Sequence, residues 1–224
     1  MKISAIIPAA GSGSRYSKTK HKLLEPLNTM PVIVHTLKKI SDIDEINEVV
    51  VCTSVELIDT INDLIKEYAI PKISKVILGG VTRQESVFIG LNNCSNPDYV
   101  LIHDGARPLI TKEIIKNSIN TAIEKGATIV AVPSKDTIKK VNSDLVVTDT
   151  PDRSCLWNVQ TPQVFKYSEL LKAHQLYKSE SMTDDAALIE KMGIDVTITK
   201  GSYSNIKITT EEDLKIAQAL LKFE

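Results

Sequence analysis

The stretch ISAIIPAAGSGSR (residues 3–15) decides how the rest of this sequence is interpreted. Its first part, residues 3–8, is a short apolar run rich in isoleucine, which predicts a buried β-strand. The second part is rich in glycine and ends in Arg15. Glycine-rich turns that follow strands often hold phosphates, so the stretch raises the questions of which sheet the strand joins and which phosphate ligand the turn holds.

Patterns of the same kind recur along the chain, and helical patterns separate them. Further strands are predicted over residues 46–53, 98–105 and 128–133, and residues 73–80 are predicted to form a strand and then a turn. Helices are predicted after Pro31, between residues 57 and 68, over residues 83–93, and from Thr111 until the chain reaches Gly126. This alternation predicts an α/β fold with a mostly parallel twisted sheet and helices on both faces. The turns at 9–15, 79–83 and 103–107 should then gather at one edge of the sheet.

The alternation of strands and helices ends near residue 134. The segment TIKKVNSDLVVTDT (residues 137–150) alternates apolar and polar residues around an NSD turn, which predicts a β-hairpin. Because an isolated hairpin is marginally stable, we expect a protruding β-arm at about residues 136–160 that packs on another subunit; a flap on the same domain is the alternative. A helix from Thr183 to about Met192, strands over 194–200 and 205–208, and a helix from about residue 211 complete one domain over residues 1–224.

Composition limits the classes of partner. The chain has 224 residues, 42% of them hydrophobic and 25% charged, with a formal net charge of −1, so nucleic acid and membranes are not expected as partners. Cys52, Cys94 and Cys155 show no metal-ligand spacing and are expected to be reduced thiols. The first apolar run is short for a signal peptide, and no run approaches the roughly 18 residues that span a bilayer. We expect a soluble, cytoplasmic protein.

The glycine-rich turn matches neither of two common phosphate-binding motifs. Gly11 and Gly13 fit the dinucleotide motif, but Tyr16 stands where the third glycine belongs, which disfavours an NAD-dependent oxidoreductase. Neither glycine is followed by the lysine and hydroxyl residue of a P-loop. The remaining pattern combines backbone N–H groups, the planar donor group of Arg15 and the mobile charge of Lys22, which suits a triphosphate. An ordinary tight turn with solvated basic residues is the alternative.

Other motifs offer charge but no acid–base pair. In HDGARP (residues 103–108), Asp104 suits Mg²⁺ or a salt bridge to Arg107, and His103 is expected to be packed. GGVTRQES (residues 79–86) offers contacts to a base or ribose, or a helix cap, and Lys207 projects opposite its apolar neighbours. A phosphate monoester is ionised near neutral pH and needs no general base as a nucleophile. Catalysis would then consist of holding two anions together and neutralising their charge.

Six motifs in order resemble one known family. PAAGSGSR, HDGARP, DTIKK, LWNVQTPQVF, TDDAAL and NIKIT, spread over about residues 3–220, are similar to those of the 2-C-methyl-D-erythritol 4-phosphate cytidylyltransferases. The resemblance implies a glycosyltransferase-A-like fold and a homodimer joined through β-arms. It also implies the reaction, in which CTP and methylerythritol phosphate give the CDP-alcohol and pyrophosphate in isoprenoid biosynthesis, with Mg²⁺ or another hard divalent cation as cofactor.

The resemblance also implies roles for individual residues. Arg15, Lys22 and Lys207 would be catalytic, and Asp104 would bind the metal. CTP would be bound by Ala9, Ala10, Gly11, Gly13, Gly80, Arg83, Ser86, Asp104 and Ala106. Methylerythritol phosphate would be bound by Asp104, Arg107, Thr137, Arg153, Thr161 and Thr183, with Arg153 reaching the partner subunit's site.

The sequence departs from the family pattern at two places, and two related functions remain as alternatives. His21 and Leu23 flank Lys22 where many members carry Pro and Gln, and Val81 stands where an acidic residue is common. The nearest rival is a ribitol-5-phosphate cytidylyltransferase, against which the pair Gly105-Ala106 argues. A non-catalytic nucleotide-binding subunit is the second, and the four charged site residues argue against it.

Overall fold

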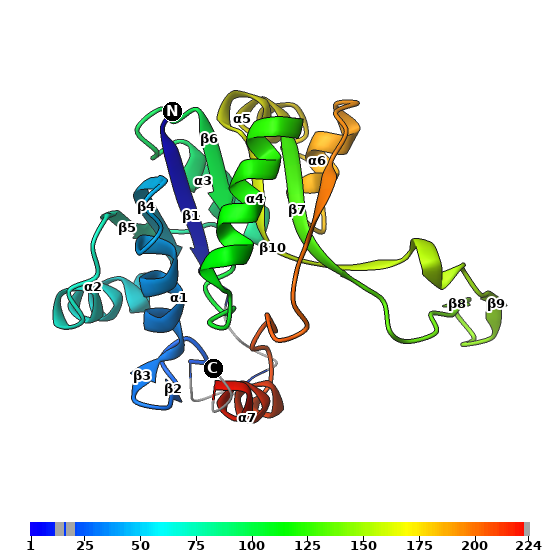
Figure 1. Cartoon of the computed structure of the whole chain (residues 1–224), viewed down its shortest axis with the longest axis horizontal. Coiled ribbons are helices and arrows are strands. Elements are labelled where there is room, and N and C mark those ends of the chain that lie inside the picture. The colour runs from blue at the N-terminus through cyan, green and yellow to red at the C-terminus, as the bar shows by residue number, and fades with distance from the viewer. Residues whose placement is uncertain (12–15, 17–20, 222–224) are drawn as a thin grey trace.

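The computed structural model describes residues 1–11, 16 and 21–221 of the chain. Seven strands form a central sheet in the order β11-β7-β10-β6-β1-β4-β5 (Figure 1). All neighbouring strands are parallel except β10, which runs antiparallel to β6 and β7. The bounds are β1 Ile3–Ala9, β4 Ile46–Thr53, β5 Ile73–Leu78, β6 Tyr99–Ile102, β7 Ala127–Pro133, β10 Trp157–Lys166 and β11 Thr197–Lys200. The mostly parallel sheet that the sequence predicts is confirmed.

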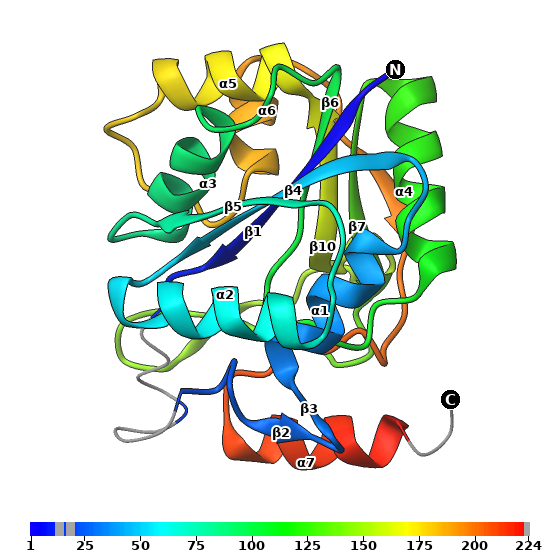
Figure 2. The ribbon, with the colours of Figure 1, turned by 90° about the vertical axis from the view of Figure 1, so that its left-hand side faces the viewer.

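Helices cover both faces of this sheet, as predicted. Their bounds are α1 Val32–Ser41, α2 Ile58–Glu67 after the short 3-10 turn η1 Val55–Leu57, α3 Arg83–Leu91, α4 Lys112–Lys125, α5 Tyr167–Leu176, α6 Ala186–Lys191 and α7 Glu211–Leu220. Side chains alternate along β1, so that Ile3, Ala5 and Ile7 pack with α1, α2 and α4. Ile6 instead packs with α3, α5 and α6 on the other face. Figure 2 shows α3 and α5 on one side of the strands and α4 on the other.

Several sequence predictions differ from the structure, and the strand predicted over residues 194–200 begins only at Thr197, as β11. β6 ends at Ile102 instead of residue 105, because the chain turns there and the N–H of Arg107 donates to the carbonyl of Asp104. Residues 205–208 form no strand. The N–H of Ile208 donates to the carbonyl of Ala106 in the turn after β6, and this single hydrogen bond makes no ladder. Asp184, and not Thr183, accepts the N–H of Ala187, so α6 begins only at Ala186.

A hairpin projects from the body of the molecule (Figure 1). β8 Lys140–Val141 and β9 Val147–Asp149 pair antiparallel in a sheet of their own. The side chain of Asn142 closes the turn by accepting the N–H groups of Asp144 and Val146. β10 begins at Trp157 and pairs with Pro133, a few residues before the end predicted for the arm at about residue 160. The strand β10, the helix α5 and the short strands β2 Pro26–Leu27 and β3 Met30–Pro31 were not predicted.

Among the residues that the structure describes, no helix is long and apolar enough to cross a bilayer.

Candidate active site

The turns that follow β1, β5 and β6 line one pocket, as the strand pattern predicts. This pocket encloses about 550 Å³, open solvent included, within the range of small-ligand sites. Ten predicted site residues lie in its wall: Ala9, Ala10, Gly11, Lys22, Gly80, Arg83, Ser86, Asp104, Ala106 and Lys207. Pro8, Leu23, Val81 and Thr82 complete the wall. Gly13 and Arg15 lie outside the described residues. We call this space the nucleotide pocket.

Hydrogen bonds hold the loop before α3 in one conformation. The N–H of Glu85 donates to the hydroxyl of Thr82, and Oε2 of Glu85 accepts the N–H groups of Thr82 and Val81. The hydroxyl of Ser86 accepts the N–H of Gly80 at 3.0 Å and donates to the carbonyl of Thr82 at 2.9 Å. A Cβ atom on Gly80 would lie 2.2 Å from Cβ of Glu85, so a side chain does not fit there. The helix-cap interpretation of this motif is confirmed.

Three cations surround the carboxylate of Asp104. Lys207 Nζ lies 2.9 Å and Arg107 Nε 3.4 Å from Oδ2, and Arg83 Nε lies 3.1 Å from Oδ1. Burial alone would raise the pKa of Asp104, but these three charges outweigh it and hold that pKa far below its usual value. The carboxylate therefore stays ionised, and the pocket keeps an excess of positive charge that suits a polyphosphate. The predicted Asp104–Arg107 pair is confirmed.

Arg83 connects Asp104 to a second buried carboxylate. Its Nη1 atom donates to Asp185 Oδ2 at 2.6 Å, and Nε2 of His174 lies 3.1 Å from Oδ1 of Asp185. Burial would raise the pKa of Asp185, yet Arg83 and His174 lower it. Sequence reasoning missed Asp185, because acidic residues in TDDAAL are explained equally well by the start of a helix. Only the distance between segments far apart in the chain identifies its partner.

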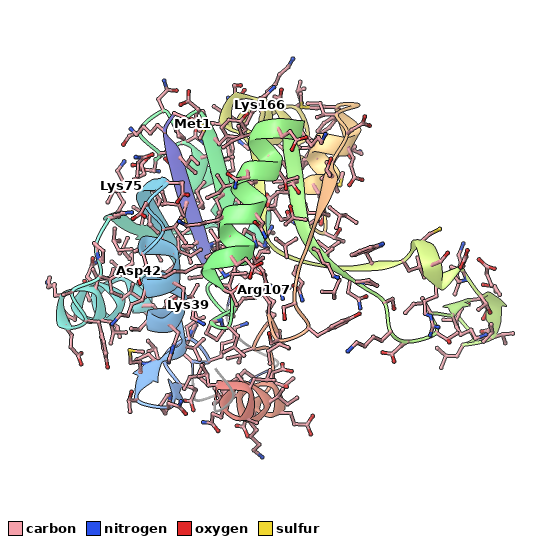
Figure 3. The ribbon with its side chains drawn as sticks, in the orientation of Figure 1. Met1, Lys39, Asp42, Lys75, Arg107 and Lys166 are labelled. Carbon is pink, nitrogen blue, oxygen red and sulfur yellow. The ribbon has the colours of Figure 1, made fainter. Side chains whose placement is uncertain are left out.

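A second cavity adjoins the nucleotide pocket and shares Arg83, Asp104 and Lys207 with it. We call it the acceptor cavity. Its wall also contains Arg107, Ile129, Val159, Gln160, Thr161, Gln163, Thr183, Asp184, Ala187 and Glu190. The predicted residues Arg107, Thr161 and Thr183 therefore lie together. Figure 3 shows Arg107 at this end of the sheet, beside the segment that leads to α7, where its Nη1 atom donates to the carbonyl of Asn205.

Two predicted residues lie outside both cavities of this chain. Thr137 and Arg153 belong to the exposed segment between β7 and β10, which carries the hairpin. Nη1 of Arg153 donates to the carbonyl of Lys135 within that segment. Conversely, sequence reasoning did not find Gln160, Gln163 and Asp184, of which Gln163 Nε2 donates to Asp184 Oδ2 at 2.9 Å. These residues lie in the motifs QTPQ and TDD, but the motifs do not show that the two segments are neighbours in space.

The acidic groups fit a metal ion that arrives with a nucleotide. Within residues 1–11, 16 and 21–221, no group of three or more His, Cys, Asp or Glu side chains could hold a metal ion. Asp104 is the acidic residue shared by the two cavity walls. Mg²⁺ usually binds one or two carboxylates together with substrate phosphates and water. This donor set therefore fits Mg²⁺ carried by a nucleotide, and it does not form an all-protein metal centre.

Comparisons with known proteins agree on one family. The family model "IspD: 2-C-methyl-D-erythritol 4-phosphate cytidylyltransferase" matches residues 3–223. The cytidylyltransferase of that name from Alkaliphilus oremlandii is 46% identical over 225 residues, covering 99% of this chain and 95% of that protein. The one from Bacillus cytotoxicus is 45% identical over 218 residues, covering 96% of each chain.

Solved structures are similar over the whole length of the chain. The crystal structure of 4-diphosphocytidyl-2C-methyl-D-erythritol synthase from Anaerococcus prevotii has a TM-score of 0.86 and 36% identity, covering 99% of this chain and 98% of that one. The 2-C-methyl-D-erythritol 4-phosphate cytidylyltransferase from Thermus thermophilus has a TM-score of 0.79 and 29% identity, covering 99% of this chain and 100% of that one.

Proposed function

The chain belongs to the 2-C-methyl-D-erythritol 4-phosphate cytidylyltransferase family, and we propose that its two adjoining cavities are the sites at which CTP and methylerythritol phosphate react. It is a CTP-dependent nucleotidyltransferase of isoprenoid precursor biosynthesis. The observation that carries the proposal is the carboxylate of Asp104, which lies between both cavities with Arg83, Arg107 and Lys207 around it.

In the proposed reaction, two anions must meet. A phosphate oxygen of methylerythritol phosphate attacks the α-phosphorus of CTP, and the bond to the β-phosphate breaks. Pyrophosphate leaves with the electron pair of that bond. Because the attacking monoester is already ionised, no general base is needed, and charge neutralisation and alignment lower the barrier.

The nucleotide pocket supplies groups for each part of CTP. Backbone N–H groups of residues 9–11 suit the phosphates, and Lys22 lies in the same wall. Gly80 and Ser86, whose positions the capped loop fixes, would contact the cytosine. Val81 is 98% exposed, so this loop would contact the base chiefly through its backbone. Family resemblance adds Arg15 and Gly13 to the phosphate-binding set.

The acceptor cavity would hold methylerythritol phosphate. Arg107 and Lys207 suit its phosphate, and the polar wall at Thr183 and Gln160 suits its hydroxyl groups. Lys207 lines both cavities, so it would contact the attacking phosphate and the phosphate under attack. Asp104 would hold Mg²⁺ together with the CTP phosphates; when bound, Mg²⁺ neutralises part of the triphosphate charge.

We also propose a homodimer in which the hairpin reaches the partner's acceptor cavity. Support comes from the exposed apolar side chains of the arm, namely Ile138, Val141, Leu145, Val146 and Val147. Exposed apolar clusters of this kind mark contact surfaces between proteins. Arg153 and Thr137 would then complete the partner's site. The single domain over residues 1–224 and the cytoplasmic location stay predictions.

Pyrophosphate release tests this function. The purified chain is incubated with CTP and Mg²⁺, and either methylerythritol phosphate or ribitol 5-phosphate is added as acceptor. We expect release only with methylerythritol phosphate. Release with ribitol phosphate alone would assign the chain to the rival enzyme, and release with neither acceptor would support a non-catalytic nucleotide-binding protein.

A further inference from the structure

We propose that His103 is a positioning residue for this reaction and that its side chain holds the turn carrying Asp104 and Arg107 in place through Thr161. The proposal rests on the proposed function of the two cavities. His103 itself lies in neither cavity wall and is fully buried, so it does not touch the substrates. It acts on the site only through its neighbours.

Three hydrogen bonds connect His103 to the site. Nδ1 of its ring lies 3.0 Å from the hydroxyl oxygen of Thr161, and Nε2 lies 3.2 Å from the carbonyl oxygen of Arg107. The same threonine hydroxyl accepts the backbone N–H of Asp104 at 3.0 Å. The ring therefore spans its own turn from residue 103 to residue 107 and ties that turn to β10.

The chemistry of these partners specifies one tautomer. A carbonyl oxygen only accepts, so Nε2 must carry the hydrogen and donate it to Arg107. Nδ1 is then an acceptor for the O–H of Thr161, whose oxygen keeps a lone pair for the N–H of Asp104.

The same network fixes the far side of the turn. Nδ2 of Asn205 donates to the carbonyl of Thr161 at 2.9 Å, and the carbonyl of Asn205 accepts Nη1 of Arg107 at 2.7 Å. Asp104 and Arg107 thus point into the site from a turn that is held at both ends. The hydroxyl of Thr161 already has two internal partners, so we assign it to positioning, although the resemblance implies substrate contact.

Conservative substitutions of Thr161 and His103 test this assignment. Thr161→Val removes the hydroxyl and keeps the shape, whereas Thr161→Ser keeps the hydroxyl. His103→Phe removes both ring hydrogen bonds. The matched control is Thr128→Val, because Thr128 is equally buried and its hydroxyl donates to the carbonyl of Thr197 on β11, away from both cavities.

We expect Thr161→Val and His103→Phe each to lower kcat by about 10²-fold, because a displacement of the order of 1 Å at a reacting group costs that much. Both should also raise the Mg²⁺ concentration for half-maximal rate, while KM for CTP changes little. Thr161→Ser should restore most of kcat, and the double variant should lose little more than either single one. Thr128→Val should lower the melting temperature but keep kcat.

The outcomes separate the two proposals. A wild-type chain that releases no pyrophosphate contradicts the proposed function, whereas an active wild type with fully active Thr161→Val and His103→Phe variants overturns the inference alone. If His103→Phe does not fold, the two Thr161 variants decide. Independently of activity, ¹⁵N NMR of the wild type should show that Nε2 of His103 carries a hydrogen and that Nδ1 does not, and an Nδ1–H tautomer would also overturn the inference.

Discussion

Replacing Arg83 by methionine should destabilise the chain strongly, and more at neutral than at acidic pH. Arg83 is the common partner of two buried carboxylates, Asp104 and Asp185, whose side chains are 7% and 1% exposed. Methionine keeps much of the length of the side chain and removes its charge. Asp104 keeps Lys207 and Arg107 as partners, so the larger loss falls on Asp185, which keeps only the hydrogen bond with Nε2 of His174 among its side-chain contacts in the described residues.

The size of the effect follows from burial. Removing one partner of a buried ion pair costs about 3–5 kcal/mol, whereas exposed pairs contribute about 0–1 kcal/mol. Because Arg83 itself is 26% exposed, we expect the lower end, about 3 kcal/mol. For a chain of this size, that corresponds to a fall in melting temperature of roughly 6–12 °C.

The pH dependence has a definite sign. In the wild type the pKa of Asp185 is lowered, so the stability it contributes is present above its unfolded pKa of about 3.9 and lost as the pH falls below that value. Without Arg83, only His174 opposes the effect of burial, so the pKa of Asp185 should rise and the carboxyl group should take up a proton at a higher pH than in the wild type. The free-energy loss caused by the substitution should therefore be largest near pH 7.5 and smaller at pH 5.

Urea unfolding at both pH values measures this loss for Arg83→Met. The matched control is Lys116→Met, which removes one cation from an exposed pair with Glu45 whose side chains are 44% and 36% exposed. Adding Asp185→Asn to Arg83→Met should restore part of the stability, because the unpaired charge disappears. A loss no larger than that of Lys116→Met, or one that grows at pH 5, would refute the reasoning.

Two further predictions concern catalysis and assembly. Lys22→Ala should lower kcat by about 10²-fold while the fold stays intact, and Lys22→Arg should not restore kcat fully. Steady-state kinetics measure kcat, and circular dichroism checks the fold. An unchanged kcat would remove Lys22 from the mechanism. Mixing equal amounts of inactive Lys207→Ala and Arg153→Ala chains should restore activity to about a quarter of the sites. About half of the dimers are then mixed, and each mixed dimer has one site with both an intact Lys207 and an intact Arg153 from its partner. Mixed chains that stay inactive would contradict the arm proposal.

Local pattern was sufficient to predict much of the fold. The strand predicted over residues 46–53 coincides with β4 Ile46–Thr53, because a buried parallel strand is a continuous run of apolar, mostly β-branched residues. The helix from Thr111 to Gly126 was predicted because its signals lie within the segment itself: Thr111 accepts the N–H of Ile114, and Gly126 adopts a φ of 94°. The order of these strands and helices also predicted that the turns after β1, β5 and β6 meet at one edge of the sheet.

The sequence did not predict which side chains pair with the site residues in space. Arg83 and Asp185 are 102 positions apart, and Thr161 is 58 positions from His103, so no spacing rule connects them. β10 was missed for the same reason, since it joins the sheet antiparallel between β6 and β7 and brings Thr161 beneath Asp104.

The sequence alone determined which residue types gather at this edge of the sheet, because glycine turns, lysines and a strand-end carboxylate are specified locally. Only the tertiary structure decided that Asp104 has three cationic partners and that a buried histidine supports its turn. The physical reason is that charge pairing and burial depend on distance in space. That distance is set by how the strands order themselves in the sheet, and not by separation along the chain.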